Sequence, residues 1–251
     1  MVAPSAAPGS DPGDPALGPF VLVADLGRPV LDRAADHHLR RVRRLRPGDP
    51  VLAADGAGGW RPCRLADGAE LVADGPVRVR PAPTPPVTVG FALVKGERPE
   101  LVVQKLTEVG VDRIVPFRAA RSVVRWDERR AEAHHARLVR VAREAVTQCR
   151  RLWVPDVAPV ATFDELVAGA AGVALTDPGG GRLAGGLSTL LVGPEGGWSP
   201  EERASGAVLV RLGAHVMRAE TAAIVAGAAL VASRSGTREG WGWLEDDAGD
   251  G

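Results

Sequence analysis

A glycine-rich loop follows an apolar run in the last third of the chain. Residues 191–202 read Leu-Val-Gly-Pro-Glu-Gly-Gly-Trp-Ser-Pro-Glu-Glu. Glycine lets backbone N–H and C=O groups approach a ligand closely, and parallel sheets bind ligands beyond the carboxyl ends of their strands. The loop lacks lysine and the glycine spacing of nucleotide-binding loops. Taken alone, it is equally typical of a ligand loop and of a tight strand-to-helix turn.

A second passage of this kind places polar side chains at the start of a helix. Residues 211–223 run from an apolar segment through Gly213 to Arg218, Glu220 and Thr221. A cation, a carboxylate and a hydroxyl at one helix start suit a site that handles charge and protons. The alternative is a helix cap with a surface ion pair between Arg218 and Glu220, which is the commoner explanation of such a passage alone.

Arginines cluster in two parts of a chain that has no net charge. Lys plus Arg and Asp plus Glu both number 31 in 251 residues. The clusters lie within 40–46 and between 118 and 151. Phosphate contacts supply much of the affinity of RNA-binding proteins, so an RNA site here would depend on local clusters. A solvated helix face is the alternative, and both interpretations stay open for the arginines of 129–140.

The first half of the chain predicts a small antiparallel barrel. Short β-like runs alternate with Asp-Gly turns, and a helix is expected over 36–45. Four of the six residues 81–86 are proline, which favours a stiff, extended linker after the barrel. The expected strands are 20–24, 50–54, 60–65, 70–72 and 77–79.

The second half predicts a mostly parallel sheet covered by helices, because apolar strands alternate with helices. Ser199 and Glu202 predict a capping box around Pro200. The expected strands are 87–94, 114–117, 173–176, 189–192 and 208–212. The expected helices are 99–109, 127–149, one that begins at Pro200, and 221–233.

The order of these motifs resembles the RsmE family of SPOUT RNA methyltransferases. The matching segments are 94–100, 104–110, 114–117 with Arg121 and Ser122, 144–149 with Arg151, Val154 and Pro155, and the two loop passages. Residues 38–49 resemble the family's PUA-like RNA-binding barrel. The match covers most of residues 20–235. One departure is Arg150, where many relatives have glycine; an arginine there affects the local backbone or adds a phosphate contact.

The resemblance implies an α/β fold: a C-terminal SPOUT domain with a parallel sheet and a trefoil knot, preceded by a PUA-like β-barrel. The expected parts are a disordered leader 1–18, the barrel 19–80, the linker 81–86, the SPOUT domain 87–238 and a flexible acidic tail 239–251. A homodimer is also implied. Small residues over 222–232 permit close helix packing, and the apolar face 225–230 would otherwise be hard to cover.

The activity that the resemblance implies is methylation of N3 of a uridine in 16S ribosomal RNA, with S-adenosylmethionine as cofactor and the 30S subunit as partner. Arg218 would stabilise negative charge on the uracil, and Glu220 would orient Arg218 or help with the proton. The expected cofactor-binding residues are Thr176, Val192, Gly193, Pro194, Glu195, Gly196, Gly197, Leu212, Gly213, Met217 and Thr221. The expected RNA-binding residues are His38, Arg40, Arg121, Arg143, Gln148 and Arg151.

Two further expectations concern the cofactor loop. Gly196 and Gly197 are expected where a side chain would clash with ligand or neighbouring backbone. Of the six tryptophans, Trp198 is the one expected beside the site, because it follows the loop directly.

Composition limits the other classes of function. Two cysteines and five histidines show no metal-ligand spacing, so no metal is expected. The scarcity of cysteine suits a reducing cytoplasm, and no apolar run is long enough to span a membrane. A knotted methyltransferase that acts on transfer RNA and a non-catalytic RNA-binding protein are the alternatives. The N-terminal barrel and residues 218–222 favour the ribosomal substrate, and a purely RNA-binding protein would not need both loops.

Overall fold

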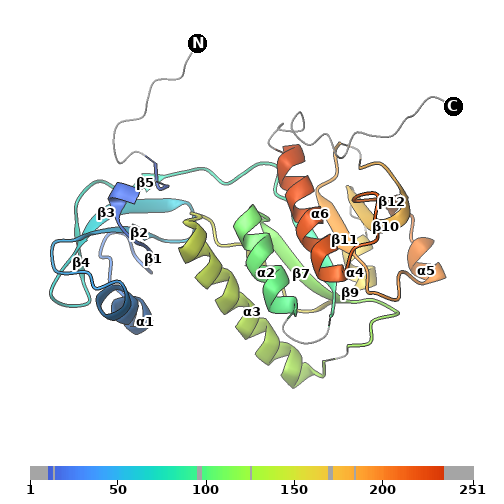
Figure 1. The fold of residues 1–251 in the computed structure, drawn as a ribbon, viewed down its shortest axis with the longest axis horizontal. Coiled ribbons are helices and arrows are strands. Elements are labelled where there is room, and N and C mark those ends of the chain that lie inside the picture. The colour runs from blue at the N-terminus through green and yellow to red at the C-terminus, as the bar shows by residue number, and fades with distance from the viewer. Residues whose placement is uncertain are drawn as a thin grey trace, which may run out of the picture. The chain divides into compact units, whose positions relative to one another are not determined.

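The proline-rich segment contains the point where the chain passes from one structural unit to another (Figure 1). The computed structural model describes residues 11–13, 15–94, 98–124, 126–168, 172–183 and 185–234. One unit contains the residues up to Ala82 together with 146–154, and the other contains the rest. Most of the expected leader, the expected tail and Lys95 to Glu97 of the first matching motif lie outside the described residues.

A five-stranded sheet forms the framework of the first unit. Its strands are β1 (Phe20–Leu22), β2 (Pro50–Ala54), β3 (Gly59–Leu65), β4 (Leu71–Ala73) and β5 (Arg78–Val79). The pairs β2–β3, β3–β4 and β3–β5 are antiparallel, as expected. In contrast, β1 pairs with β2 in parallel. The all-antiparallel prediction is wrong here because residues 23–49 form the long crossover that a parallel pair requires.

The helix of this crossover begins and ends earlier than the expected 36–45. It consists of α1 (Arg33–His37) and a π-helical turn, η2 (His38–Val42). Asp32 caps its start, since its carboxylate accepts a hydrogen bond from the backbone N–H of Ala35 at 2.7 Å. The helix stops before Arg44, whose φ of 58° does not fit a right-handed helix.

Apolar side chains under this helix form the core of the first unit. Leu39 packs with Val51, Leu65 and Leu71, and Cys63 lies among them. Burial raises the pKa of the Cys63 thiol to about 11. The thiol is therefore neutral at physiological pH and packs as a small apolar group.

The departure at Arg150 has a structural explanation. The long helix α3 (Glu128–Cys149) ends just before Arg150, whose φ of 59° is the left-handed conformation usual for a glycine at this point. The Arg150 guanidinium donates hydrogen bonds to the backbone carbonyls of Pro12 at 2.9 Å and Gly18 at 3.0 Å. Its side chain thus ties the end of α3 to the N-terminal segment of the same unit.

Substitutions at Arg150 separate the contribution of its side-chain hydrogen bonds from that of its left-handed backbone. We expect Arg150→Ala to lower the free energy of unfolding by about 1–3 kcal/mol, because these hydrogen bonds are lost while the left-handed backbone remains. Arg150→Gly loses the same bonds but relieves about 1 kcal/mol of backbone strain. Urea unfolding should therefore rank the variants as wild type, glycine, alanine in falling stability. Equal stabilities for alanine and glycine would show that the backbone conformation is unstrained.

The second unit contains a seven-stranded sheet in which every pair is parallel, as predicted. The order is β12-β10-β11-β6-β7-β8, and β9 also pairs with β7. The strands are β6 (Thr88–Ala92), β7 (Arg113–Arg118), β8 (Asp156–Val157), β9 (Ala161–Thr162), β10 (Val173–Gly181), β11 (Thr189–Val192) and β12 (Val208–Val210). The trefoil knot that the resemblance implies stays a prediction.

Helices cover this sheet. Besides α3, they are α2 (Arg98–Val109), α4 (Phe163–Val167), α5 (Pro200–Arg203) and α6 (Ala219–Arg234). The predicted capping box of α5 is confirmed, with Ser199 and Glu202 each accepting the other's backbone N–H. Helix α4 and strands β8 and β9 were not predicted, because elements this short show no periodicity. No helix in the described part of the chain is both long and apolar enough to cross a membrane.

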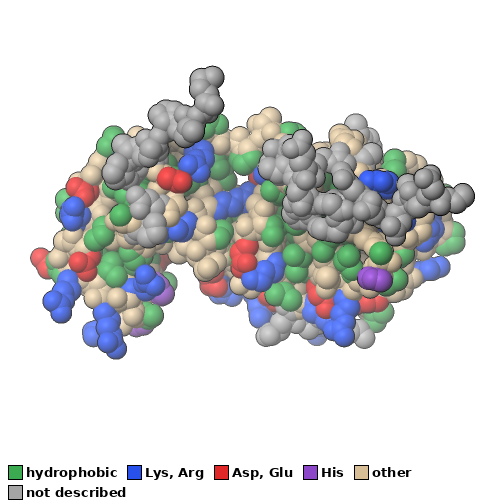
Figure 2. Space-filling view, turned by 45° about the horizontal axis from the view of Figure 1, so that its top comes forward, with side chains coloured by type: hydrophobic (Ala, Val, Ile, Leu, Met, Phe, Trp, Pro, Cys, Tyr) green, Lys and Arg blue, Asp and Glu red, His purple; other side chains and the backbone are tan. Residues whose placement is uncertain are grey.

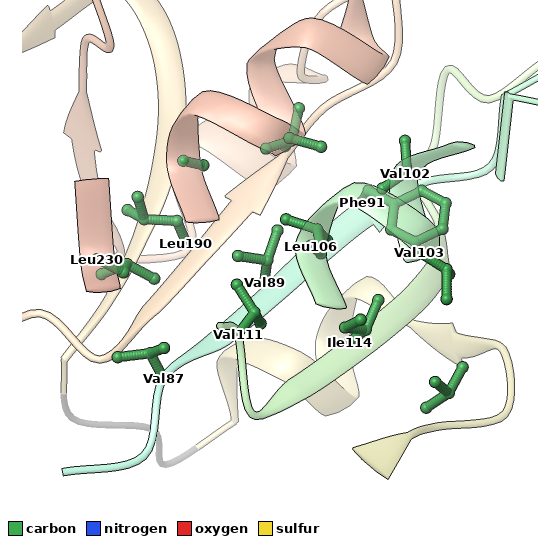
Figure 3. Packing of buried hydrophobic residues seen from close by; sticks show 14 of the residues in the cluster. Val87, Val89, Phe91, Val102, Val103, Leu106, Val111, Ile114, Leu190 and Leu230 are labelled. Atoms are coloured by element: carbon green, nitrogen blue, oxygen red, sulfur yellow. The ribbon is translucent and has the colours of Figure 1, made fainter. Parts of the chain in front are cut away.

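The main core lies between the sheet and helices α2 and α6 (Figure 3). Val89, Phe91 and Leu190 of the strands pack with Leu106 of α2 and Leu230 of α6. A Cβ added at Gly227 would lie 2.5 Å from the Cδ2 atom of Leu106, so α6 packs closely on α2. The expectation that the face 225–230 needs a partner chain is wrong. Most of these residues are buried within the unit.

Candidate active site

A cavity of about 170 Å³ lies in the second unit, at the place where parallel sheets bind ligands. Three segments line it: Thr176 to Pro178 of β10, residues 192–198 after β11, and residues 212–222 after β12. Nine of the eleven predicted cofactor-binding residues lie here: Thr176, Val192, Gly193, Pro194, Glu195, Gly197, Leu212, Gly213 and Met217. The other two, Gly196 and Thr221, do not line the cavity, and Thr221 is exposed.

Trp198 forms one wall of this cavity. Its side chain is 3% exposed, and its ring stacks on that of Phe117 with centroids 6.1 Å apart. The indole N–H donates a hydrogen bond to the carbonyl of Thr176 at 2.9 Å, which joins β10 to the loop after β11. A Cβ added at Gly193 would lie 3.0 Å from this ring, so the strand end must pass it without a side chain.

The glycine loop is constrained by backbone conformation rather than by crowding. Gly197 has a φ of 67°, and a Cβ added there would meet no protein atom within 4 Å. A Cβ added at Gly196 would make an ordinary contact with the Cβ of Arg121 at 3.4 Å. The expected clash with neighbouring backbone is therefore wrong. What the structure requires is a left-handed residue at Gly197, whose N–H closes a turn onto the carbonyl of Pro194 at 2.8 Å.

The loop is held in place from the segment that follows β7. The guanidinium of Arg121 donates to the carbonyl of Gly196 at 3.1 Å. Glu202, which is buried, accepts hydrogen bonds from the backbone N–H groups of Ala120 and Ser199, both at 2.8 Å. Arg121, predicted to bind RNA, thus also supports the cofactor loop.

A second carboxyl at the start of α5 is exposed. The pKa of Glu201 is lowered by its own backbone N–H and by the hydroxyl of Ser199, both of which donate to the carboxylate. Its negative charge is therefore stabilised at the helix N-terminus.

The two predicted catalytic residues do not pair with each other. Arg218 is exposed, and its side chain makes no ion pair with the described residues. The side chain of Glu220 is 12% exposed, and its Oε1 atom lies 3.7 Å from Nε of Arg98. Nη1 of the same arginine lies 3.2 Å from Oε1 of Glu195. Arg98 was not predicted as a site residue, because only the tertiary structure brings it to these carboxylates.

The predicted RNA-binding residues lie in both units. His38, Arg40, Gln148 and Arg151 belong to the first unit, and Arg121 and Arg143 to the second. On the face seen in Figure 2, acidic and basic side chains are interspersed. That face therefore does not show the one-sided charge distribution expected of an RNA-binding surface.

Arg40 has a structural role that its position in a basic cluster did not reveal. Its guanidinium binds the carboxylate of Asp36 at 2.7 Å and the carbonyls of Ala66 at 2.7 Å and Gly68 at 2.6 Å. With these acceptors bound, Arg40 is a poor candidate for a phosphate contact. The neighbouring arginines at 41, 43, 44 and 46 are exposed.

A metal site is not evident in the part of the chain that the structure describes. No three His, Cys, Asp or Glu side chains come together there in a group that could hold a metal ion.

Comparisons with known proteins agree on one family. Residues 80–231 match the model of an RNA methyltransferase domain, and residues 31–71 match that of an RNA methyltransferase PUA domain. Ribosomal RNA small subunit methyltransferase E of Mycobacterium bovis is 37% identical to this chain, and the match covers 78% of this chain and 83% of the relative. The enzyme of the same name from Synechocystis is 33% identical, with 78% and 70% covered.

Solved structures show the same fold. A Legionella pneumophila protein in complex with the cofactor SAM has a TM-score of 0.71 at 25% identity, with 85% of this chain and 97% of that chain covered. Ribosomal RNA small subunit methyltransferase E from Neisseria gonorrhoeae, bound to S-adenosylmethionine, has a TM-score of 0.69 at 24% identity, with 84% and 96% covered. The chain therefore belongs to the family of RNA methyltransferases that includes ribosomal RNA small subunit methyltransferase E.

Proposed function

We propose that this chain transfers a methyl group from S-adenosylmethionine to N3 of a uridine in the RNA of the small ribosomal subunit. The observation that carries the proposal is the cavity in which the glycine loop meets the passage after β12. The relatives named small-subunit methyltransferases support the substrate. The bound cofactor of the Legionella and Neisseria structures supports the methyl donor.

The residues around the cavity fit this cofactor. Leu212, Met217 and Trp198 offer an apolar, polarizable surface to the adenine and the methionine chain. Asp177 offers a buried carboxylate that accepts from the N–H of Gly179 at 2.9 Å and pairs with Arg203. Such a carboxylate can accept hydrogen bonds from sugar hydroxyls or an ammonium group. When bound, S-adenosylmethionine supplies an electrophilic methyl group.

Arg218 is proposed to stabilise the charge that develops on the acceptor base. The imide nitrogen of uracil is a poor nucleophile until its proton leaves, and the resulting negative charge spreads to the ring oxygens. A guanidinium next to those oxygens stabilises that charge more in the transition state than in the ground state. Arg218 suits this role because it lies between two residues that line the cavity, Met217 and Ala219, and is itself exposed.

The RNA is proposed to bind through exposed polar residues of both units. The exposed ones are His38, Arg121, Arg143, Gln148 and, in place of Arg40, the arginines at 41, 43, 44 and 46; the half-buried Arg151 is included with them. Their phosphate contacts would hold the strand while the target base leaves its stack to reach the cavity.

A methylation assay tests the function against its alternatives. Purified 30S subunits, free 16S ribosomal RNA and transfer RNA are incubated with labelled methyl donor, and the product nucleoside is identified by mass spectrometry. We expect N3-methyluridine in small-subunit RNA only, and the first two substrates show whether assembly is needed. Methylation of transfer RNA instead would favour the alternative of a knotted methyltransferase that acts on transfer RNA. Failure to bind the donor in calorimetry would favour a non-catalytic RNA-binding protein.

We also propose a homodimer that needs no metal and works in the cytoplasm. Val216, which lines the cavity, is 82% exposed, and Val123 after β7 is 75% exposed. Covering these apolar side chains near the site would favour association. Light scattering at micromolar concentration should give twice the mass of one chain. A single-chain mass would contradict the dimer, and loss of activity with a chelator would contradict metal independence.

A further inference from the structure

Arg98 lies between two carboxylates, that of Glu195 in the glycine loop and that of Glu220 at the start of α6. It stands at the start of α2, and its guanidinium lies 3.2 Å from Oε1 of Glu195 and 3.7 Å from Oε1 of Glu220. Glu195 lines the cavity; Glu220 does not line it, but directly follows Ala219, which does. One arginine therefore connects the cofactor loop with the start of α6 at the edge of the cavity.

The second oxygen of Glu220, Oε2, has no hydrogen-bond partner among the described residues. Among the side chains of the described residues, only two buried oxygen or nitrogen atoms lack a hydrogen bond, Oε2 of Glu220 and Oε2 of Glu100. A buried carboxylate oxygen without a donor is costly, and such atoms in a native structure call for an explanation. A substrate that brings its own hydrogen-bond donor to this oxygen would explain why the protein supplies none.

We propose that Oε2 of Glu220 accepts the N3 proton of the uridine and that Arg98 is the positioning residue that holds Glu220 for this task. The inference rests on the proposed function. Arg98 lies against Oε1 of Glu220, so this ion pair does not occupy Oε2. The Arg218 guanidinium remains free for the ring oxygens because it does not pair with Glu220.

The bonds and charges balance in this step. The N3–H bond breaks and its proton forms a bond with Oε2 of Glu220. The electron pair left on N3 forms the new bond to the methyl carbon, and the pair of the breaking carbon–sulfur bond stays on sulfur, which becomes neutral. Glu220 then releases the proton to water once the product has left.

The arrangement also predicts which base is accepted. Uracil presents an N–H donor at N3 between two carbonyl oxygens, which matches a carboxylate acceptor flanked by a guanidinium donor. Cytosine has an unprotonated N3, which would leave two acceptors facing each other with no proton between them. The site should therefore reject cytosine at the target position.

Single-turnover kinetics with 30S subunits test these roles. We expect Glu220→Gln, which keeps the shape but is no longer a base, to slow methyl transfer by about 100- to 10,000-fold. Arg98→Ala should slow it by about 100-fold through misplacement of Glu220, and Arg98→Lys should restore part of the rate. The Kd for S-adenosylmethionine should change little in Glu220→Gln, so the loss appears in the rate.

A matched pair of residues provides the control. Arg137 binds Oε1 of Glu100 at 3.0 Å, and Oε2 of Glu100 is the other unpartnered oxygen. We expect Arg137→Ala to lower the melting temperature while the rate per folded molecule stays at the wild-type value. Wild-type rates in Glu220→Gln, or equal rates in Arg98→Ala and Arg137→Ala, would overturn the inference. A wild-type protein that methylates no small-subunit RNA would instead overturn the proposed function.

Discussion

Replacing Gly197 with valine is expected to raise the Kd for S-adenosylmethionine by about 5- to 150-fold. Gly197 has a φ of 67°, where a β-branched residue is strongly disfavoured. Strain of this kind costs on the order of 1–3 kcal/mol, and each 1.4 kcal/mol is a tenfold change in affinity. The loop is expected to relieve the strain by turning its peptide groups away from the cavity. Isothermal calorimetry with the purified variant measures the loss.

Gly206→Val is the matched control for this substitution. Gly206 has a φ of 87°, a Cβ there would also meet nothing within 4 Å, and the residue does not line the cavity. Both variants should lower the melting temperature by similar amounts, but only Gly197→Val should lose the cofactor. If Gly197→Val binds as tightly as wild type, the glycine loop does not hold the cofactor. If both variants lose binding equally, the loss reflects general destabilisation.

Local sequence signals predicted most of the framework around the cavity. The strand before the glycine loop and the capping box at Ser199 depend on neighbouring residues, so both can be read from a short window. Helix α2 ends at Val109, as predicted, and Gly110 follows it with a φ of 101°. The same local signals placed the loops that line the cavity, because ligand loops follow the ends of parallel strands.

Long-range contacts were not predictable in this way. Arg98 and Glu195 lie 97 residues apart, and no window that contains one of them contains the other. The hydrogen bond from Trp198 to Thr176 likewise joins strand β10 to the loop after β11. In the first unit, the parallel pairing of β1 and β2 depends on where a long connection returns, which turn signals do not encode. The structural role of Arg40 was not predictable for the same reason, since its backbone acceptors at 66 and 68 are distant in sequence.

The structure argues against one of the two explanations for Arg218. The competing explanation, a pair with Glu220 that fixes the helix start, does not hold because the partner of Glu220 is Arg98. The N-terminal turn of α6 is therefore not supported by the Arg218 side chain. Its removal should leave the fold intact and act on the reaction alone.

Arg218→Ala is expected to lower the rate of methyl transfer by about 100- to 1000-fold, the usual cost of losing one donor to a developing negative charge. Binding of S-adenosylmethionine and of 30S subunits should stay near wild type, because the interaction strengthens only in the transition state. Arg218→Lys should recover part of the rate, since lysine keeps the charge but lacks the planar fork of donors. Single-turnover assays, calorimetry and melting curves measure these quantities.

Arg211→Ala provides the control for charge, because Arg211 is another exposed arginine of the same passage and does not line the cavity. Both alanine variants remove one positive charge near the proposed RNA, so both should weaken RNA binding slightly and equally. Only Arg218→Ala should slow the step that follows binding. A folded Arg218→Ala protein that methylates saturating 30S subunits at the wild-type rate would exclude Arg218 from the chemistry and leave Glu220 with Arg98 to act without it.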